Sequence, residues 1–109
     1  MRAGEPVRRF IKCGDTMTDR EIMAMAVERF GGRQLVKCCE ELAELQQAIC
    51  KLFDGSVTYD MDLEAVVEEM ADVEIMLEQV RMILGVDPEQ EARWRDRKLR
   101  RLRARMEQQ

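Results

Sequence analysis

Residues 33–53 read RQLVKCCEELAELQQAICKLF, and residues 63–84 read LEAVVEEMADVEIMLEQVRMIL. In the first stretch, apolar side chains recur at alternating steps of three and four residues: Leu35, Cys38, Leu42, Leu45, Ile49 and Leu52. The second stretch has the same spacing at Val66, Met70, Val73, Leu77, Val80 and Leu84. This spacing is typical of amphipathic helices that pack against one another. The two stretches therefore predict two long, neighbouring helices, with Asp62 as the N-cap of the second.

Two further helices are predicted, one on each side of this pair. Thr18 and Glu21 form a capping box, which predicts a helix from about residue 19 to residue 30 that ends at the glycines that follow. Asp87 and Pro88 are typical of the start of a last helix. Four apolar residues of this last helix are expected to face inward: Ala92, Leu99, Leu102 and Met106.

The fold class that follows is all-α. We expect a four-helix bundle-like domain over residues 18–109, preceded by an N-terminal arm over residues 1–17. The composition agrees, because 46% of the 109 residues are hydrophobic and only 5% are aromatic. No stretch is apolar for long enough to span a membrane. Arg2, Arg8 and Arg9 are not followed by the apolar run of a secretory signal, so we expect a cytoplasmic protein.

Charge is spread unevenly along the chain. Residues 1–88 hold 18 acidic and 10 basic residues, a net charge of −8, and residues 89–109 hold 4 acidic and 8 basic residues, a net charge of +4. The basic residues of the last helix lie all round it instead of on one face. We therefore do not expect nucleic-acid binding, which would show as a strongly salt-dependent affinity for DNA or RNA.

Paired carboxylates occur once on each long helix. Glu41 and Glu44 lie about 100° to one side of the apolar stripe of their helix, and Glu69 and Asp72 lie similarly on theirs. Two adjacent helices could point these four side chains at one position. Carboxylates so close together repel one another unless a cation lies between them.

The chain has no His, which excludes the Glu-x-x-His type of di-iron site. An oxygen-only site predicts Mg²⁺, with Mn²⁺ as the alternative.

The pattern E-E-x-x-E at residues 40–44, followed by E-x-x-D at residues 69–72, resembles the signature of the MazG-like all-α nucleoside triphosphate pyrophosphohydrolases. The resemblance covers about residues 33–84. It implies a Mg²⁺-dependent enzyme that cleaves a nucleoside triphosphate to a nucleoside monophosphate and pyrophosphate. It also implies a homodimer or homotetramer in which helices of two subunits close each site. The metal ligands that it implies are Glu41, Glu44, Glu69 and Asp72.

Other charged residues have expected roles around this site. Glu40 could orient a ligand or accept a proton from a metal-bound water. Lys37 lies one turn before Glu41, where it could bind the outer phosphates or simply pair with Glu41, and both roles stay open. Arg97 and Lys98 are further candidates for phosphate binding. The alternative function is a catalytically silent helical module for dimerisation or regulation, and an assay for pyrophosphate release distinguishes the two.

Overall fold

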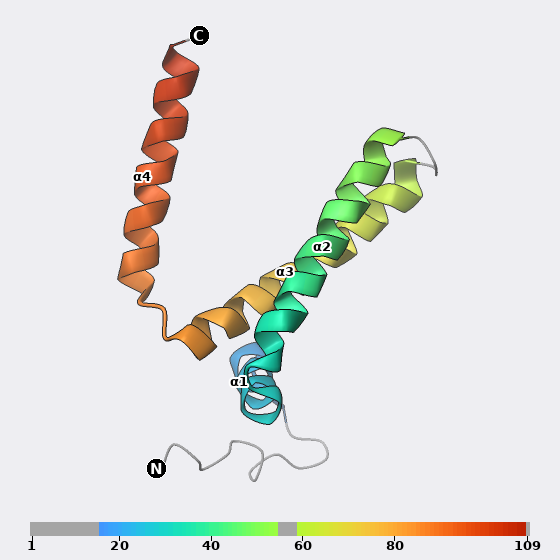
Figure 1. Ribbon diagram of the computed structural model, residues 1–109, viewed down its shortest axis with the longest axis vertical. Coiled ribbons are helices and arrows are strands. Elements are labelled where there is room, and N and C mark those ends of the chain that lie inside the picture. The colour runs from blue at the N-terminus through green and yellow to red at the C-terminus, as the bar shows by residue number, and fades with distance from the viewer. Residues whose placement is uncertain (1–15, 55–58, 109) are drawn as a thin grey trace.

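The computed structural model describes residues 16–54 and 59–108. It contains four helices, which are α1 (Asp19–Phe30), α2 (Arg33–Asp54), α3 (Tyr59–Leu84) and α4 (Pro88–Glu107). No strand occurs in these residues, so the prediction of an all-α fold is confirmed (Figure 1). Of the arm that we predicted over residues 1–17, all but Thr16 and Met17 lies outside the described part of the chain.

Local capping explains where α1 and α4 begin. The Glu21 backbone amide donates to Thr18 Oγ1 at 3.1 Å, and the Thr18 amide donates to Glu21 Oε1 at 2.8 Å, which completes the capping box. At the start of α4 the Asp87 carboxylate accepts from the Glu89 amide at 3.0 Å. These two predictions are confirmed. The third is wrong, because α3 begins three residues before Asp62, which therefore lies inside the helix.

The centre of the fold is an antiparallel pair formed by α2 and α3, and α1 packs across one end of it (Figure 1). The buried apolar residues of this pair are Cys38, Ala48, Val66, Val73 and Met76. Its register is marked by a buried amide, because Gln34 Nε2 donates to Gln79 Oε1 at 2.7 Å and Gln79 is only 3% exposed. Because the helices are antiparallel, a residue a given number of positions after Gln34 lies opposite the residue the same number of positions before Gln79.

The buried face differs from the one that the apolar spacing predicts. Leu42, Ile49 and Met70, which we expected near the centre of the helix contact, are 40–52% exposed. The helices instead meet along the side of the stripe that carries Glu41 and Ala48. The reason is that the apolar face of α2 and α3 is wider than one helix contact, so packing one side of it leaves the other uncovered. A broad apolar surface of the pair is consequently open in a single chain.

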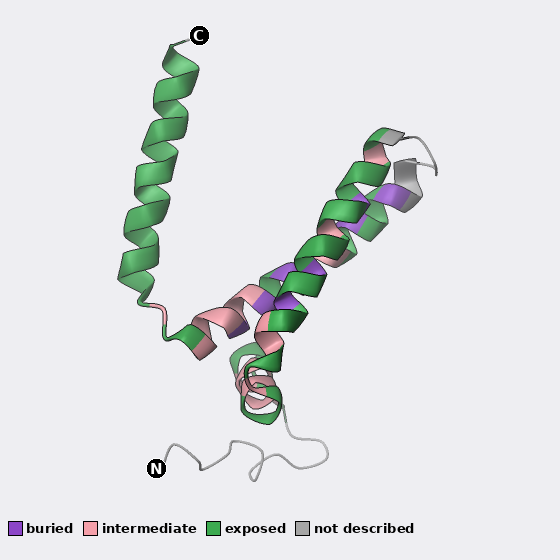
Figure 2. Cartoon of the chain, viewed as in Figure 1, coloured by how far each residue is buried: buried purple, intermediate pink, exposed green. Residues whose placement is uncertain are grey.

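Helix α4 lies apart from the other three helices (Figures 1 and 2). All its residues are exposed, so the expectation that Ala92, Leu99, Leu102 and Met106 face inward is wrong within one chain. At the corner, Gly85 adopts the left-handed conformation (φ 63°) that glycine tolerates and other residues rarely adopt. The chain thereby turns away from α3, and the apolar side of α4 receives no cover from the described helices.

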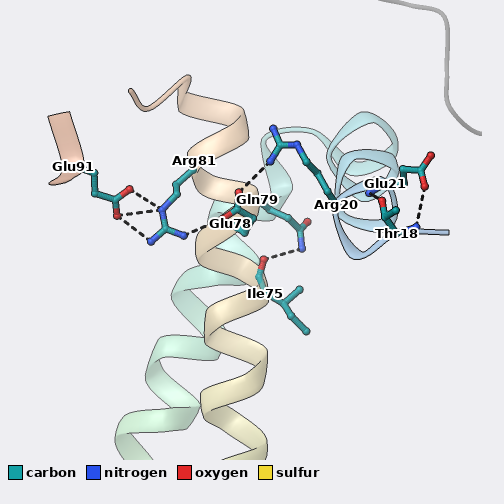
Figure 3. Close-up of polar contacts among 8 residues, drawn as sticks. All are labelled: Thr18, Arg20, Glu21, Ile75, Glu78, Gln79, Arg81 and Glu91. Atoms are coloured by element: carbon teal, nitrogen blue, oxygen red, sulfur yellow. Dashed lines mark hydrogen bonds and ion pairs between the residues drawn. The ribbon is translucent and has the colours of Figure 1, made fainter. Parts of the chain in front are cut away.

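One ion-pair network ties this corner together (Figure 3). Arg81 donates to both carboxylate oxygens of Glu91, with Nε–Oε1 at 2.8 Å and Nη2–Oε2 at 2.9 Å. Glu78 accepts from Arg81 Nη1 and from Arg20 Nη1, each at 3.3 Å. These contacts join α1, α3 and the first turn of α4. The bidentate pair links the first turn of α4 to the end of α3.

Candidate metal centre

Three carboxylates from two helices converge where α2 and α3 cross. One oxygen each from Glu41, Glu69 and Asp72 lie within 4.8 Å of one another. The antiparallel register explains the meeting: seven residues on from Gln34 is Glu41, and seven residues back from Gln79 is Asp72, one turn from Glu69. The helices therefore bring together three of the four carboxylates that we expected to share one position.

Burial makes this cluster unusual. Glu41 is 6% exposed, and Glu69 and Asp72 are half-buried. Glu41 Oε2 and Glu69 Oε2 are both out of contact with solvent and have no hydrogen-bond partner among the described residues. A buried carboxylate oxygen without a partner costs free energy, and native proteins seldom leave one unsatisfied. Two such oxygens in one cluster are what an oxygen-seeking cation would satisfy.

The electrostatics of the cluster also favour a bound cation. The pKa of Glu41 is raised above its ordinary value of 4.5, first by burial and then by repulsion from Glu44, with Asp72 adding and Lys37 opposing. The pKa of Glu69 is raised first by burial and then by repulsion from Glu44, Glu41 and Asp72. Both groups therefore resist ionisation in the metal-free protein. A divalent cation would reverse this resistance, because it favours the charged carboxylates.

The remaining acidic candidates lie at the edge of the cluster. Glu44 is exposed and is not one of the three converging residues, although its charge raises the pKa of both Glu41 and Glu69. Glu40 is exposed, and its Oε1 lies 3.9 Å from Lys37 Nζ. Their assignments as a ligand and as a proton acceptor stay predictions.

The basic candidates divide into one that reaches the cluster and two that do not. Lys37 Nζ lies 3.6 Å from Glu41 Oε1, so the ion pair that we left open is present. The Lys37 side chain is 51% exposed and thus remains accessible to a ligand. Arg97 and Lys98 lie on α4, away from the cluster of their own chain, and the Arg97 guanidinium stacks 4.8 Å from the centre of the Trp94 ring. Their role in phosphate binding also stays a prediction.

The sequence patterns missed a second group of polar residues beside the cluster. A pocket of about 270 Å³ is lined by Glu44, Gln47, Ala48, Lys51, Asp62, Ala65 and Glu69. Asp62 is 5% exposed. The missed signal was the register: Lys51 lies seventeen residues after Gln34, and Asp62 lies seventeen before Gln79, so the two are opposite each other. Polar residues thus continue along the contact from the carboxylate cluster into this pocket.

Comparison of the chain with protein-family models, with curated proteins and with solved structures finds no match. None of the described helices combines the length and the hydropathy needed to cross a lipid bilayer. The assignment of the site therefore depends on its own chemistry. An all-oxygen, acidic donor set without His or Cys fits Mg²⁺ or Mn²⁺ better than zinc or iron.

The raised pKa values predict how Mg²⁺ will stabilise the fold at different pH. Since the folded-state pKa values of Glu41 and Glu69 lie above 4.5, their contribution to metal-free stability is complete below pH 4.5. It is lost as the pH rises through the raised values. Mg²⁺ binding needs the ionised carboxylates, so its effect has the opposite sign. We expect the increase in Tm caused by Mg²⁺ to be small near pH 5 and larger at pH 7.5.

Thermal unfolding followed by circular dichroism, with and without Mg²⁺ at each pH, measures this difference. Ca²⁺-free buffer with EDTA provides the metal-free reference. A Mg²⁺ effect that is equal at both pH values would mean that the ion stabilises the protein at some place other than these carboxylates.

Proposed function

We propose that the chain is a Mg²⁺-dependent nucleoside triphosphate pyrophosphohydrolase of the MazG-like kind. The observation that carries this proposal is the cluster of Glu41, Glu69 and Asp72, in which two carboxylate oxygens are buried without partners. The E-E-x-x-E and E-x-x-D patterns supply these residues on successive helices, in the order of that family. Mn²⁺ is the alternative ion.

The acidic residues of the cluster and Lys37 have different roles in the proposed reaction. Glu41, Glu69 and Asp72 would hold the cation, and Glu44 at the edge of the cluster would be a further ligand. A cation held there would supply neutralisation of the phosphate charge and activation of the attacking water. Lys37, already beside Glu41, contacts the outer phosphates. Water adds to the α-phosphorus, and the bond from that phosphorus to the bridging oxygen of the β-phosphate breaks. The products are a nucleoside monophosphate and pyrophosphate.

We also propose that the active form is a homo-oligomer, a dimer or a tetramer. Two uncovered surfaces support this: the open apolar side of α2 and α3, and the whole of α4. Their charges complement each other. Helix α4 carries 8 basic and 4 acidic residues, whereas α3 carries 8 acidic residues and 1 basic residue. Helix α4 of one copy on the acidic pair of another would cover both surfaces. A cytoplasmic location belongs to the same proposal, since nucleoside triphosphates are pooled there.

Incubation of the protein with Mg²⁺ and a panel of dNTPs tests this function directly. We expect release of pyrophosphate together with the matching monophosphate, and none when EDTA replaces Mg²⁺. Inorganic phosphate and a diphosphate as products would place the cleavage at the other anhydride bond and overturn the proposal. Absence of any product would favour the alternative, a silent module for dimerisation or regulation that has kept the fold.

A further inference from the structure

We infer that the pocket beside the carboxylate cluster is a base subsite in which Asp62 and Lys51 select guanine. This rests on the proposed function, because it names the base of the nucleotide whose phosphates would bind the cation held by Glu41 and Glu69. The pocket has a volume of about 270 Å³, shares Glu69 with the acidic cluster, and is also lined by Glu44 at the edge of the cluster. A ligand that binds the cation at one end can therefore extend into the pocket at the other.

Asp62 supplies an acidic hydrogen-bond acceptor to the wall of this pocket. It lines the pocket and is 5% exposed as a whole residue, although the buried carboxylate oxygens that lack a partner belong to Glu41 and Glu69. Lys51, on the facing helix, lines the same pocket and is exposed, but it makes no ion pair with Asp62 among the described residues. The lining of the pocket thus contains one acceptor and one donor, which come from facing helices. An ionised carboxylate only accepts hydrogen bonds, so a donor group of a ligand that enters the pocket can bind Asp62.

The spacing suits a nucleotide. Asp62 and Glu69 are seven residues apart on α3, which is two turns on one face and about 10.5 Å along the helix axis. This is on the scale of a nucleoside between its α-phosphate and the far edge of its base. Lys37 lies on the other side of the cluster, four residues before Glu41. The outer phosphates would lie toward Lys37, the α-phosphate at the cluster, and the base toward Asp62.

The chemistry of the pair selects one base. An ionised carboxylate only accepts hydrogen bonds, so it favours a base edge with two neighbouring donors. Guanine offers N1–H and the 2-amino group side by side, followed by O6, an acceptor that a lysine ammonium can meet. Adenine, cytosine and thymine each place an acceptor next to their single donor group, and that acceptor would be repelled by Asp62. Asp62 on the donor edge and Lys51 on O6 therefore match guanine alone.

The test compares wild type with Asp62→Asn on Mg²⁺ complexes of dGTP, dATP, dCTP, dTTP and the xanthine nucleotide dXTP. In xanthine a carbonyl replaces the 2-amino group of guanine. We expect wild type to prefer dGTP about tenfold or more in kcat/KM over each other base. Asp62→Asn should lose this preference and gain activity on dXTP, because the asparagine amide donates to the added carbonyl. Glu64→Gln, an exposed carboxylate on the same helix, is the matched control and should behave as wild type.

Calorimetric binding of a non-hydrolysable dGTP analogue with Mg²⁺ separates this inference from the proposed function. Hydrolysis of all bases at similar rates, or retention of guanine preference by Asp62→Asn, overturns the guanine subsite and leaves the pyrophosphohydrolase standing. Weaker Mg²⁺ binding by Asp62→Asn without a change in base preference would make Asp62 a cation ligand, which also overturns it. If no triphosphate is hydrolysed, the proposed function is overturned. The binding measurement then tests the base subsite separately, and equal affinity for guanine and adenine analogues would overturn it. Should Asp62→Asn not fold, exposed Lys51→Met tests the O6 contact, with a several-fold loss expected for dGTP alone.

Discussion

Glu69→Gln is expected to abolish hydrolysis while leaving the metal-free protein as stable as wild type or more so. The side chain keeps its shape but loses the charge that the cation needs. A metal ion contributes several kcal/mol to stabilisation of the transition state, so its loss lowers the rate by about a hundredfold to a thousandfold. No ordinary surface substitution has this effect.

The stability half of the prediction comes from the same geometry. Glu69 Oε2 is buried without a partner, and burial followed by repulsion from Glu44 raises the pKa of Glu69. Removing the charge therefore removes an unfavourable interaction from the metal-free fold. A structural carboxylate would behave in the opposite way, because its neighbours would lose a partner. The two halves together distinguish a metal ligand from a residue that merely supports the helix.

Pyrophosphate release at saturating Mg²⁺ and thermal unfolding in EDTA measure the two halves. Glu68→Gln is the matched control, because it makes the same chemical change at the adjacent, exposed position of α3. It should retain activity and Tm. A metal-free Glu69→Gln protein that is unfolded at room temperature would show that the carboxylate is structural, and the assigned role would be wrong.

Local signals in the sequence were sufficient to place the starts of α1 and α4, but not the start of α3. The capping box at Thr18 and Glu21 and the cap at Asp87 set the starts of α1 and α4 as predicted. Helix geometry alone predicted the side of each apolar stripe on which the carboxylate pairs lie. The meeting of Glu41, Glu69 and Asp72 also needs the register of the helix pair, and Glu44, which we expected with them, is not one of the three.

The sequence does not show which surface covers each apolar helix face. Leu42 and Ile49 belong to an apolar stripe whose spacing predicts burial without saying what covers it. Asp62 looked like a cap because it precedes an apolar run, but α3 begins one turn earlier, at Tyr59. Its burial opposite Lys51 arises from the register of the helix pair, a property of two segments that neither one encodes alone.

Leu102→Asp is expected to dissociate the proposed oligomer. Ala92, Leu99, Leu102 and Met106 lie along one side of α4 at steps of seven, three and four residues, the spacing of a helix-packing seam. All four are exposed in the single chain. A 20-residue helix without packing partners is only marginally stable in water, so α4 is expected to obtain its stability from a contact. The acidic α2–α3 pair of a second copy offers both an apolar surface and opposite charge.

The size of the effect follows from burial. Covering a leucine is worth about 1.5–3 kcal/mol, and a symmetric dimer loses it twice. Aspartate adds the cost of placing a negative charge against acidic α3. Dissociation should be at least about a hundredfold easier, so that Leu102→Asp is monomeric at micromolar concentration by analytical ultracentrifugation.

Ala104→Asp is the matched control for this change, because it adds the same charge about 160° round the helix from Leu102. It should remain assembled, and Leu102→Asp should lose helical circular dichroism at 222 nm as its unsupported α4 frays. If both variants sediment with the wild-type mass, α4 does not carry the assembly. If wild type itself is a monomer with a fully formed α4, the exposed seam is a stable surface in its own right. The site would then have to be complete within one chain, where Lys37 supplies the positive charge beside Glu41 and the arginines of α4 take no part.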